Sequence, residues 1–190
     1  MQKRRTTTYT LCATALMTAV MCVLSPISIP IGPVPISLAT LVVLLSVYIL
    51  GTKWSIVSVV VYLILGMIGL PVFSGFSGGF AKLAGPTGGY LIGYIFLALI
   101  SGVIMTFAEK KFSEKKKIIP LTFVGMLIGT LVLYAFGTVW FILLMDTTFA
   151  YALTVCVLPF LPFDIVKIII AIILGRTIRS RLAKASIGTR

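Results

Sequence analysis

Long runs of apolar residues, interrupted by short polar or glycine- and proline-rich segments, make up most of the chain. A membrane-spanning helix needs about 20 mostly apolar residues, with a range of roughly 17 to 25. By this criterion the pattern predicts six spanning helices, with approximate ranges 9–24, 34–50, 54–70, 89–108, 118–144 and 163–178. We therefore expect residues 1–190 to form a single membrane domain that is almost entirely helical.

The first of these runs could instead be a signal peptide, because basic residues precede an apolar core. However, Met21 stands before Cys22, where a lipoprotein cleavage site requires a small residue, and no A-x-A site follows. We therefore expect 9–24 to be retained as a spanning helix. Cys12, Cys22 and Cys156 form no C-x-x-C pair, and we interpret each of them as a small buried apolar residue.

Composition supports a membrane protein. Hydrophobic residues make up 59% of the chain and charged residues 11%, and the mean hydropathy is +1.18; soluble domains are about a quarter charged. A net charge of +12 could indicate a nucleic-acid partner, but the basic residues lie in the gaps between apolar runs. This placement is typical of anchors to an anionic lipid bilayer, so we expect no nucleic-acid partner.

The basic residues also predict an orientation. If the N-terminus lies inside the cell, all but two of the 16 Lys and Arg residues fall on inner segments. The exceptions are Lys82, in an outer segment, and Lys167, in the last span. Because short cytoplasmic segments carry an excess of Lys and Arg, this distribution predicts that both termini are cytoplasmic.

Two predicted outer segments differ from ordinary solvated loops. Segment 25–37 holds four prolines and a glycine, and segment 71–89 holds six glycines and two prolines. Irregular backbone is tolerated at membrane depth only where protein buries it or where it lines a cavity, because lipid cannot satisfy its amide groups. Glycine also lets a backbone approach a ligand closely. Together with the proline-rich entry to the last span, at 159–164, these segments predict a pocket that opens to the outer side.

Asp164 and Lys167 lie at the start of the last apolar run. A charge in the middle of a membrane costs about 2.5 to 3.5 kcal/mol on insertion scales, so it is usually paired or functional. Residues three apart share one face of a helix. The pair could simply neutralise itself, or Asp164 could relay protons, although the apolar runs offer it no second acid. A third interpretation is a clamp, because a carboxylate acceptor beside an ammonium donor matches a urea or an amide.

Two further motifs are weak evidence when taken alone. GPTGGY, at 85–90, opens the fourth predicted span, and free N–H groups at a helix start suit an anion such as a carboxylate. Thr87 could equally cap that helix. Ala15 and Ala19 lie one turn apart in the first span, and small residues at this spacing let two helices approach closely.

Common enzyme motifs are absent from the sequence. There is no His, no G-x-x-x-x-G-K-[ST] loop, and no H-E-x-x-H or G-x-S-x-G motif. Asp146 and Asp164 could indicate an intramembrane aspartyl protease, but Asp146 falls at a predicted span end, where we expect it to cap the segment that follows. We therefore expect neither an enzyme nor a metal site, and no cofactor.

Four segments together resemble a known family. They are VPISLATLVVLLSVYILG (34–51), YLILGMIGLPVFSGFSGG (62–79), GPTGGYLIGYIFLALISG (85–102) and PFLPFDIVK (159–167). In this order and spacing they are similar to the BioY family, the biotin-binding S components of energy-coupling-factor (ECF) transporters. The segment GLPVF, followed by GPTGGY and a late Pro-x-Asp-x-x-Lys, makes the resemblance highly specific.

The resemblance implies the ECF S-component fold, an all-α polytopic membrane protein with six transmembrane helices, located in the cell membrane. It implies an outward biotin pocket with a lid formed by the first outer loop. The implied partners are a transmembrane coupling protein (the T component) and two ATPase subunits, with Ala15 and Ala19 on the contact face. The implied mechanism is capture of biotin outside, reorientation of the subunit in the bilayer and release inside, powered by the ATPases.

Position by position, the resemblance implies that Asp164 and Lys167 hold the ureido ring of biotin. It also places Tyr90 and the glycine-rich loop at 71–89, which includes Phe73 and Ser77, around the pocket. The alternative is a self-sufficient transporter that uses Asp164 as its proton site, although no inverted repeat in the sequence supports it.

The chain departs from the family pattern at three positions, the first of which is near Ser77, where some relatives have an Asn in the loop. Leu91 stands directly after GGY, where some relatives have Arg, and Phe163 stands where a Gly usually precedes the Asp. The Leu91 departure removes a natural partner for the biotin carboxylate. The substitutes that we expect to bind it are Lys82, Thr87 and the backbone of Gly88 and Gly89.

Overall fold

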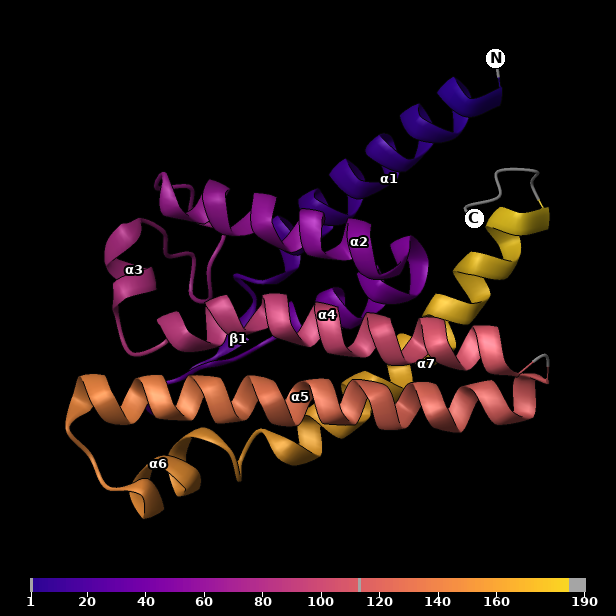
Figure 1. Cartoon of the computed structure of the whole chain (residues 1–190). Helices are drawn as coiled ribbons and strands as arrows, with labels where there is room; N and C mark the ends of the chain where they lie inside the picture. The colour runs from indigo at the N-terminus through magenta and orange to yellow at the C-terminus, as the bar shows by residue number, and fades with distance from the viewer. Residues whose placement is uncertain (1, 113, 185–190) are drawn as a thin grey trace.

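A computed structural model describes residues 2–112 and 114–184 as a bundle of helices with one small sheet (Figure 1). In chain order the elements are α1 Gln2–Leu24, β1 Ser28–Ile29, β2 Ile36–Ser37, α2 Ala39–Met67, α3 Phe80–Ala84, α4 Gly88–Lys111, α5 Lys115–Met145, α6 Phe149–Cys156 and α7 Leu161–Lys184. The most extensive contact joins α4 and α5, which lie side by side along most of their length (Figure 1). The predicted helical architecture is confirmed, apart from the short β1–β2 hairpin.

The β1–β2 hairpin occupies the first proline-rich segment. Its strands pair antiparallel, with Ser28 opposite Ser37 and Ile29 opposite Ile36. The helix predicted for 34–50 therefore begins later, at Ala39. Proline fixes φ and lacks an N–H donor, so the prolines of this segment prevent an earlier start. The hairpin contacts the glycine-rich loop after α2, where the backbone N–H of Gly75 donates to the Pro26 carbonyl at 3.0 Å.

α2 turns back on itself at Gly51. There φ is +76° and ψ is 176°, a backbone conformation that is essentially restricted to glycine. The first arm follows directly on β2, and in the last turn of the second arm Gly66 packs against the ring of Phe73 from the glycine-rich loop. Both ends of α2 therefore lie at the end of the bundle that holds the hairpin. Gly51 lies at the other end, in a crevice with Glu109 and Arg179.

Replacing Gly51 with alanine is expected to destabilise the fold by about 1–3 kcal/mol, the usual cost of holding such a residue in a sparsely populated backbone region. Apart from its chain neighbours, no heavy atom lies within 4 Å of an added Cβ, so backbone strain alone produces the effect. Thermal unfolding of the detergent-solubilised protein measures it. Lys53→Ala, at an exposed position of the same turn, is the control. Equal stability of Gly51→Ala and the wild type would show that the reversal does not depend on glycine.

Within the described residues, three helices are long and apolar enough to cross a membrane: Ala39–Met67, Gly88–Lys111 and Lys116–Met145. α6 and α7, which are bent by 46° at a short break, pass the same test as a pair. α1 contributes a shorter apolar stretch, Thr8–Leu24. α2 counts once here although it consists of two arms. If each arm is one span, then the two arms, α4, α5, the α6–α7 pair and α1 together agree with the count of six spans. That count stays a prediction.

Glycines let α4 and α5 approach each other closely. A Cβ at Gly93 would lie 2.6 Å from the Leu133 side chain, and one at Gly137 would lie 2.4 Å from the Tyr90 ring. Small residues at such contacts allow van der Waals packing between membrane helices, which lack a hydrophobic driving force in lipid. The two helices therefore form a rigid wall, and Tyr90 is fixed in that wall.

The connection between α5 and α6 corrects one prediction. Asp146 does not cap the helix that follows; it ends α5, in the left-handed conformation with φ 48° and ψ 46°. Aspartate tolerates this conformation better than most residues do. Thr148 precedes α6 instead, without a side-chain capping bond. The short helix α6 between the last two predicted spans was not expected from the sequence.

The prediction that all three cysteines are buried is only partly right. Cys156 is buried and Cys22 is half-buried, but Cys12 is exposed on α1. The surface of a membrane helix faces lipid, so an apolar thiol needs no burial there. The positions of the cysteines therefore indicate apolar surroundings, which can be either lipid or the protein core.

The end of the bundle opposite the hairpin is rich in basic residues, and we call it the basic end. It includes Lys110 and Lys111 at the end of α4, and Arg176, Arg179 and Arg181 in the last turns of α7. Arg179 of α7 forms a two-point ion pair there with Glu109 of α4. The first turn of α1 and the last turn of α7 are both on this side of the molecule (Figure 1). This grouping supports the predicted orientation, with the basic end in the cytoplasm, which stays a prediction. Arg190, which also entered that prediction, lies outside the described residues.

Candidate functional site

Asp164 and Lys167 are both buried at the start of α7, with 3% and 7% of their surfaces exposed. The Lys167 ammonium lies 2.8 Å from the Asp164 carboxylate, so the structure places the pair on one helix face as the spacing predicts. Taking a charge out of water is costly unless it is paired and hydrogen-bonded. The pair is therefore the natural starting point for a binding site.

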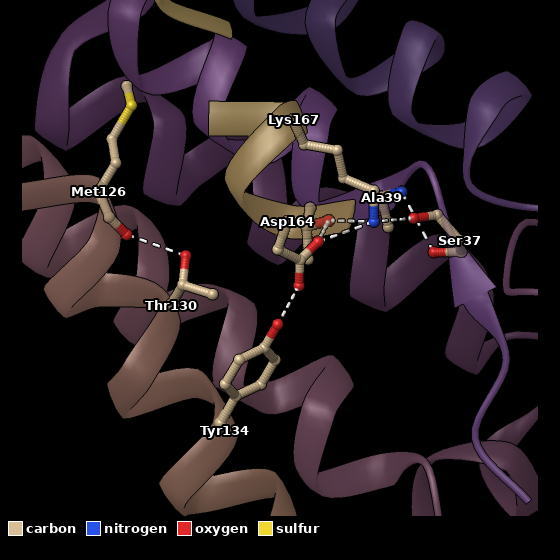
Figure 2. Close-up of polar contacts among 8 residues, drawn as sticks. Ser37, Ala39, Met126, Thr130, Tyr134, Asp164 and Lys167 are labelled. Carbon is tan, nitrogen blue, oxygen red and sulfur yellow. Dashed lines mark hydrogen bonds and ion pairs between the residues drawn. The ribbon is translucent and has the colours of Figure 1, made fainter. Parts of the chain in front are cut away.

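Two further side chains complete the surroundings of the carboxylate. The Thr40 hydroxyl, from the first arm of α2, donates to Asp164 Oδ1 at 3.0 Å. The Tyr134 hydroxyl, from α5, donates to Oδ2 at 2.5 Å. Figure 2 shows the carboxylate between the Lys167 ammonium on one side and the Tyr134 ring on the other. Asp164 thus joins three helices through hydrogen bonds to both of its oxygens.

All three donors of Lys167 are engaged. Its ammonium donates to Asp164 Oδ1 at 2.8 Å, to Thr40 Oγ1 at 3.0 Å and to the backbone carbonyl of Ser37 at 2.8 Å. An ammonium has three N–H groups and no acceptor. A ligand carbonyl can therefore bind Lys167 only if it replaces one of these contacts. The Ser37 contact belongs to strand β2, so movement of the hairpin would release it.

The network borders a small cavity beneath the hairpin. Its volume is about 40 Å³, and it is lined by Val34, Pro35, Ser37, Thr40, Tyr90, Tyr94, Leu133, Tyr134, Phe160, Asp164 and Lys167. Sites for drug-sized ligands have volumes of about 300–1,000 Å³, whereas one water fills roughly 30 Å³ of liquid. The described conformation is therefore closed. Val34, Pro35 and Ser37 form the part of the lining that belongs to the hairpin.

Tyr90 is the third predicted residue that lines this cavity. It is buried in the first turn of α4, and its hydroxyl lies 3.1 Å from the Thr138 hydroxyl of α5. Tyr94 follows one turn later and also lines the cavity. α4 therefore supplies two aromatic side chains to the cavity, and α5 holds the hydroxyl of one of them, Tyr90.

The predicted carboxylate ligands at the start of α4 do not reach the cavity in this conformation. Added Cβ atoms show that Gly88 packs against the backbone of Leu83 and Gly89 against the Trp140 side chain. Thr87 makes no side-chain capping bond, so its interpretation as a helix cap is wrong. Its buried hydroxyl has no hydrogen-bond partner within the part of the chain that is described. Its role in binding stays a prediction.

The predicted residues of the glycine-rich loop also lie away from the cavity. Phe73 is fully buried and packs edge-on against Tyr62, with ring centroids 5.5 Å apart. The Ser77 hydroxyl donates to the Ser74 carbonyl at 2.8 Å. Lys82 is half-buried in the short helix α3. These side chains stabilise the loop that contacts the hairpin, and their direct contact with a ligand stays a prediction.

Sequence reasoning missed four polar residues that line the cavity, namely Ser37, Thr40, Tyr94 and Tyr134. Tyr94 could have been found, because it stands four residues after Tyr90 and therefore on the same helix face. Thr40 and Tyr134 could have been suspected as polar groups within apolar runs. Ser37 acts through its backbone carbonyl, which no side-chain pattern reveals.

Ala15 and Ala19 lie far along the chain from this site, on an exposed face of α1. Val23 continues the same face one turn later and is 67% exposed. Inside a bilayer such a face meets either lipid or another membrane helix. The small alanines make the second option geometrically favourable.

The site can bind a neutral ligand that offers N–H groups beside a carbonyl. Asp164 supplies the acceptor and Lys167 the donor, while Tyr90, Tyr94 and Phe160 supply aromatic surface. A proton relay fits less well, because Asp164 is the one acid among the residues that line the cavity. The described residues also contain no cluster of three or more potential metal ligands.

Comparison with known proteins identifies similar sequences over nearly the whole length. The family model described as "BioY family" matches residues 1–184. "Biotin transporter BioY" of Thermotoga maritima is 37% identical over 160 residues, which cover 84% of this chain and 89% of that protein. "Probable biotin transporter BioY" of Pyrococcus horikoshii is 39% identical over 165 residues, which cover 87% and 93% respectively.

A solved structure agrees with the fold. It is described as the S-component for biotin from an ECF-type ABC transporter, at 2.1 Å resolution. It is similar to this chain with a TM-score of 0.79 and 31% sequence identity, and the match covers 94% of this chain and 93% of the other. The relatives are named as transporters and not as enzymes.

Proposed function

This chain belongs to the BioY family of multi-pass membrane proteins, and from that premise we propose that it captures biotin at the site built around Asp164 and Lys167. The observation that carries the proposal is the buried network in which both charges border one cavity beneath a hairpin. A pair of this kind that served only to neutralise itself would not need to line a cavity.

The chemistry of biotin fits this network. Its ureido ring presents N–H groups beside a carbonyl, which pair with the carboxylate of Asp164 and the ammonium of Lys167. Tyr94 and Phe160 offer aromatic surface for the fused rings and the aliphatic chain. Tyr134 fixes the carboxylate orientation through its hydroxyl, so the acceptor is preorganised before the ligand arrives.

Capture requires the hairpin to move. A cavity of about 40 Å³ is smaller than the ligand, so Val34 and Pro35 must withdraw from it. The same movement takes the Ser37 carbonyl away from Lys167 and frees one N–H group for the ureido carbonyl. The hairpin then closes over the bound ligand and again excludes water.

The biotin carboxylate would lie toward the outer end of α4. The partial positive charge at a helix start suits an anion. The buried Thr87 hydroxyl without a partner among the described residues supports this end of the site. Lys82 and the backbone N–H groups of Gly88 and Gly89 are the other proposed ligands, and they need the glycine-rich loop to shift together with the hairpin.

We further propose that a transmembrane coupling protein and two ATPases provide the energy for uptake, while the subunit reorients in the bilayer. The exposed alanines of α1 support such a partner, because they offer a flat face for close helix contact. The chain itself contains no phosphate-binding G-x-x-x-x-G-K-[ST] loop, so ATP hydrolysis by that route needs another subunit.

Isothermal titration of the detergent-solubilised protein with biotin tests the proposed ligand. We expect a dissociation constant below about 1 μM, which corresponds to ~8 kcal/mol of binding free energy. Riboflavin and thiamine are the controls, since both are vitamins that lack the saturated ureido ring. Equal binding of all three vitamins, or no heat with biotin, would contradict the assignment.

A further inference from the structure

The basic end of the bundle also contains a crevice of about 610 Å³ between the first arm of α2, the end of α4, the start of α5 and the last turns of α7. It is lined by Tyr48, Glu109, Ile118, Ile119, Ile173, Arg176, Thr177, Arg179 and Ser180. None of these residues lines the cavity beneath the hairpin. The crevice is therefore a separate site, and the proposed capture of biotin does not use it.

The charges of the crevice are not balanced. Glu109 is already held by the two-point ion pair with Arg179. Arg176 is exposed, and it forms no hydrogen bond or ion pair within residues 2–112 and 114–184. Its guanidinium can donate two parallel hydrogen bonds to a phosphate. One cation at the rim is thus available for an anionic ligand.

The other wall of the crevice is apolar. Ile118 and Ile119 of α5 face Ile173 of α7, which is 59% exposed. A free phosphate or another small ion would gain nothing from this wall. An amphiphile would bury it, with its head at Arg176 and an acyl chain along the isoleucines. The wall lies where apolar helices end among basic residues, which is the level of the lipid headgroups.

From this combination we propose that the crevice binds an anionic phospholipid. Its phosphate pairs with Arg176, and one acyl chain covers Ile118, Ile119 and Ile173. A lipid held in this way contacts α4, α5 and α7 together and stabilises the basic end of the bundle. A zwitterionic lipid has the same phosphate, but its ammonium group meets a surface that is already positive, so the anionic headgroup is preferred.

Titration of the detergent-solubilised protein with short-chain phosphatidylglycerol tests the proposal, with phosphatidylcholine of the same chain length in a second arm. We expect tighter binding of phosphatidylglycerol. Arg176→Gln should weaken it about fivefold, the equivalent of ~1 kcal/mol for one basic residue at a lipid surface. Arg181→Gln is the matched control, because Arg181 is exposed on the same helix but does not line the crevice.

Other outcomes overturn the proposal. Equal binding of the two lipids would show that charge does not select the ligand. An equal loss in the Arg181→Gln variant would show that general surface charge binds the lipid and not the crevice. A third arm uses glycerol phosphate, which has no acyl chain; if it binds as tightly as phosphatidylglycerol, the site is a phosphate site only. The melting temperatures of both variants without lipid verify that they are folded.

Discussion

Replacing Asp164 with asparagine is expected to weaken biotin binding by more than tenfold, or at least ~1.4 kcal/mol. Asparagine keeps the shape of the side chain but turns one acceptor oxygen into a donor. Thr40, Tyr134 and Lys167 all donate to the carboxylate, so some of these donors lose their partner. A buried charge left without its partner costs about 3–5 kcal/mol. Isothermal titration with biotin measures the loss.

Lys167→Ala tests the other half of the clamp and is also expected to weaken binding by more than tenfold. The matched control for Asp164→Asn is Asp146→Asn, which makes the same chemical change at an exposed acid outside the cavity. Melting temperatures separate a loss of binding from a loss of fold. Wild-type affinity in both the Asp164→Asn and the Lys167→Ala variants would refute a role for the pair in holding biotin.

The second large effect is expected at α1. Replacing Ala15 or Ala19 with tryptophan should abolish co-purification with the coupling protein while biotin binding by the isolated subunit stays unchanged. Both alanines are exposed, so an indole fits without disturbing the core. It would however hold a partner helix several ångströms away and remove the close contact that small residues permit. Affinity purification of the co-expressed complex gives the readout.

Val139→Trp is the control for that experiment. Val139 lies on α5 and is 54% exposed, so the variant adds the same bulk to a different lipid-facing surface. We expect this variant to retain its partners. An intact complex with tryptophan at both Ala15 and Ala19 would contradict the proposed contact face, and loss of the complex in the Val139 variant would show that the effect is not specific to α1.

The charged pair could be predicted because its signal is local. Two opposite charges three residues apart in an apolar run must share a helix face, whatever the rest of the fold does. Thr40 and Tyr134 give a weaker signal, because a hydroxyl in an apolar run does not reveal its partner. They lie 124 and 30 residues from Asp164 along the chain, so only the packing of α2 and α5 against α7 brings them to the carboxylate. A hydroxyl in an apolar run can also bond to its own helix, as Thr130 does to the Met126 carbonyl (Figure 2).

The hairpin could not be predicted for a different reason. Val34 and Ile36 are apolar, so segment 34–50 has the composition of one continuous span. In the structure these two residues belong to the hairpin and are buried, with 5% of their surfaces exposed. Hydropathy does not distinguish a side chain that faces lipid from one that covers a pocket. The prolines around these residues were the better guide, because they disfavour a helix there.

The complete engagement of Lys167 has a consequence for the subunit when no vitamin is bound. Its charge and that of Asp164 cancel under the closed hairpin, so a passing sodium or chloride ion could satisfy only one of them and would strand the other. A pocket closed in this way disfavours inorganic ions, because the paired charges leave no net charge to attract them.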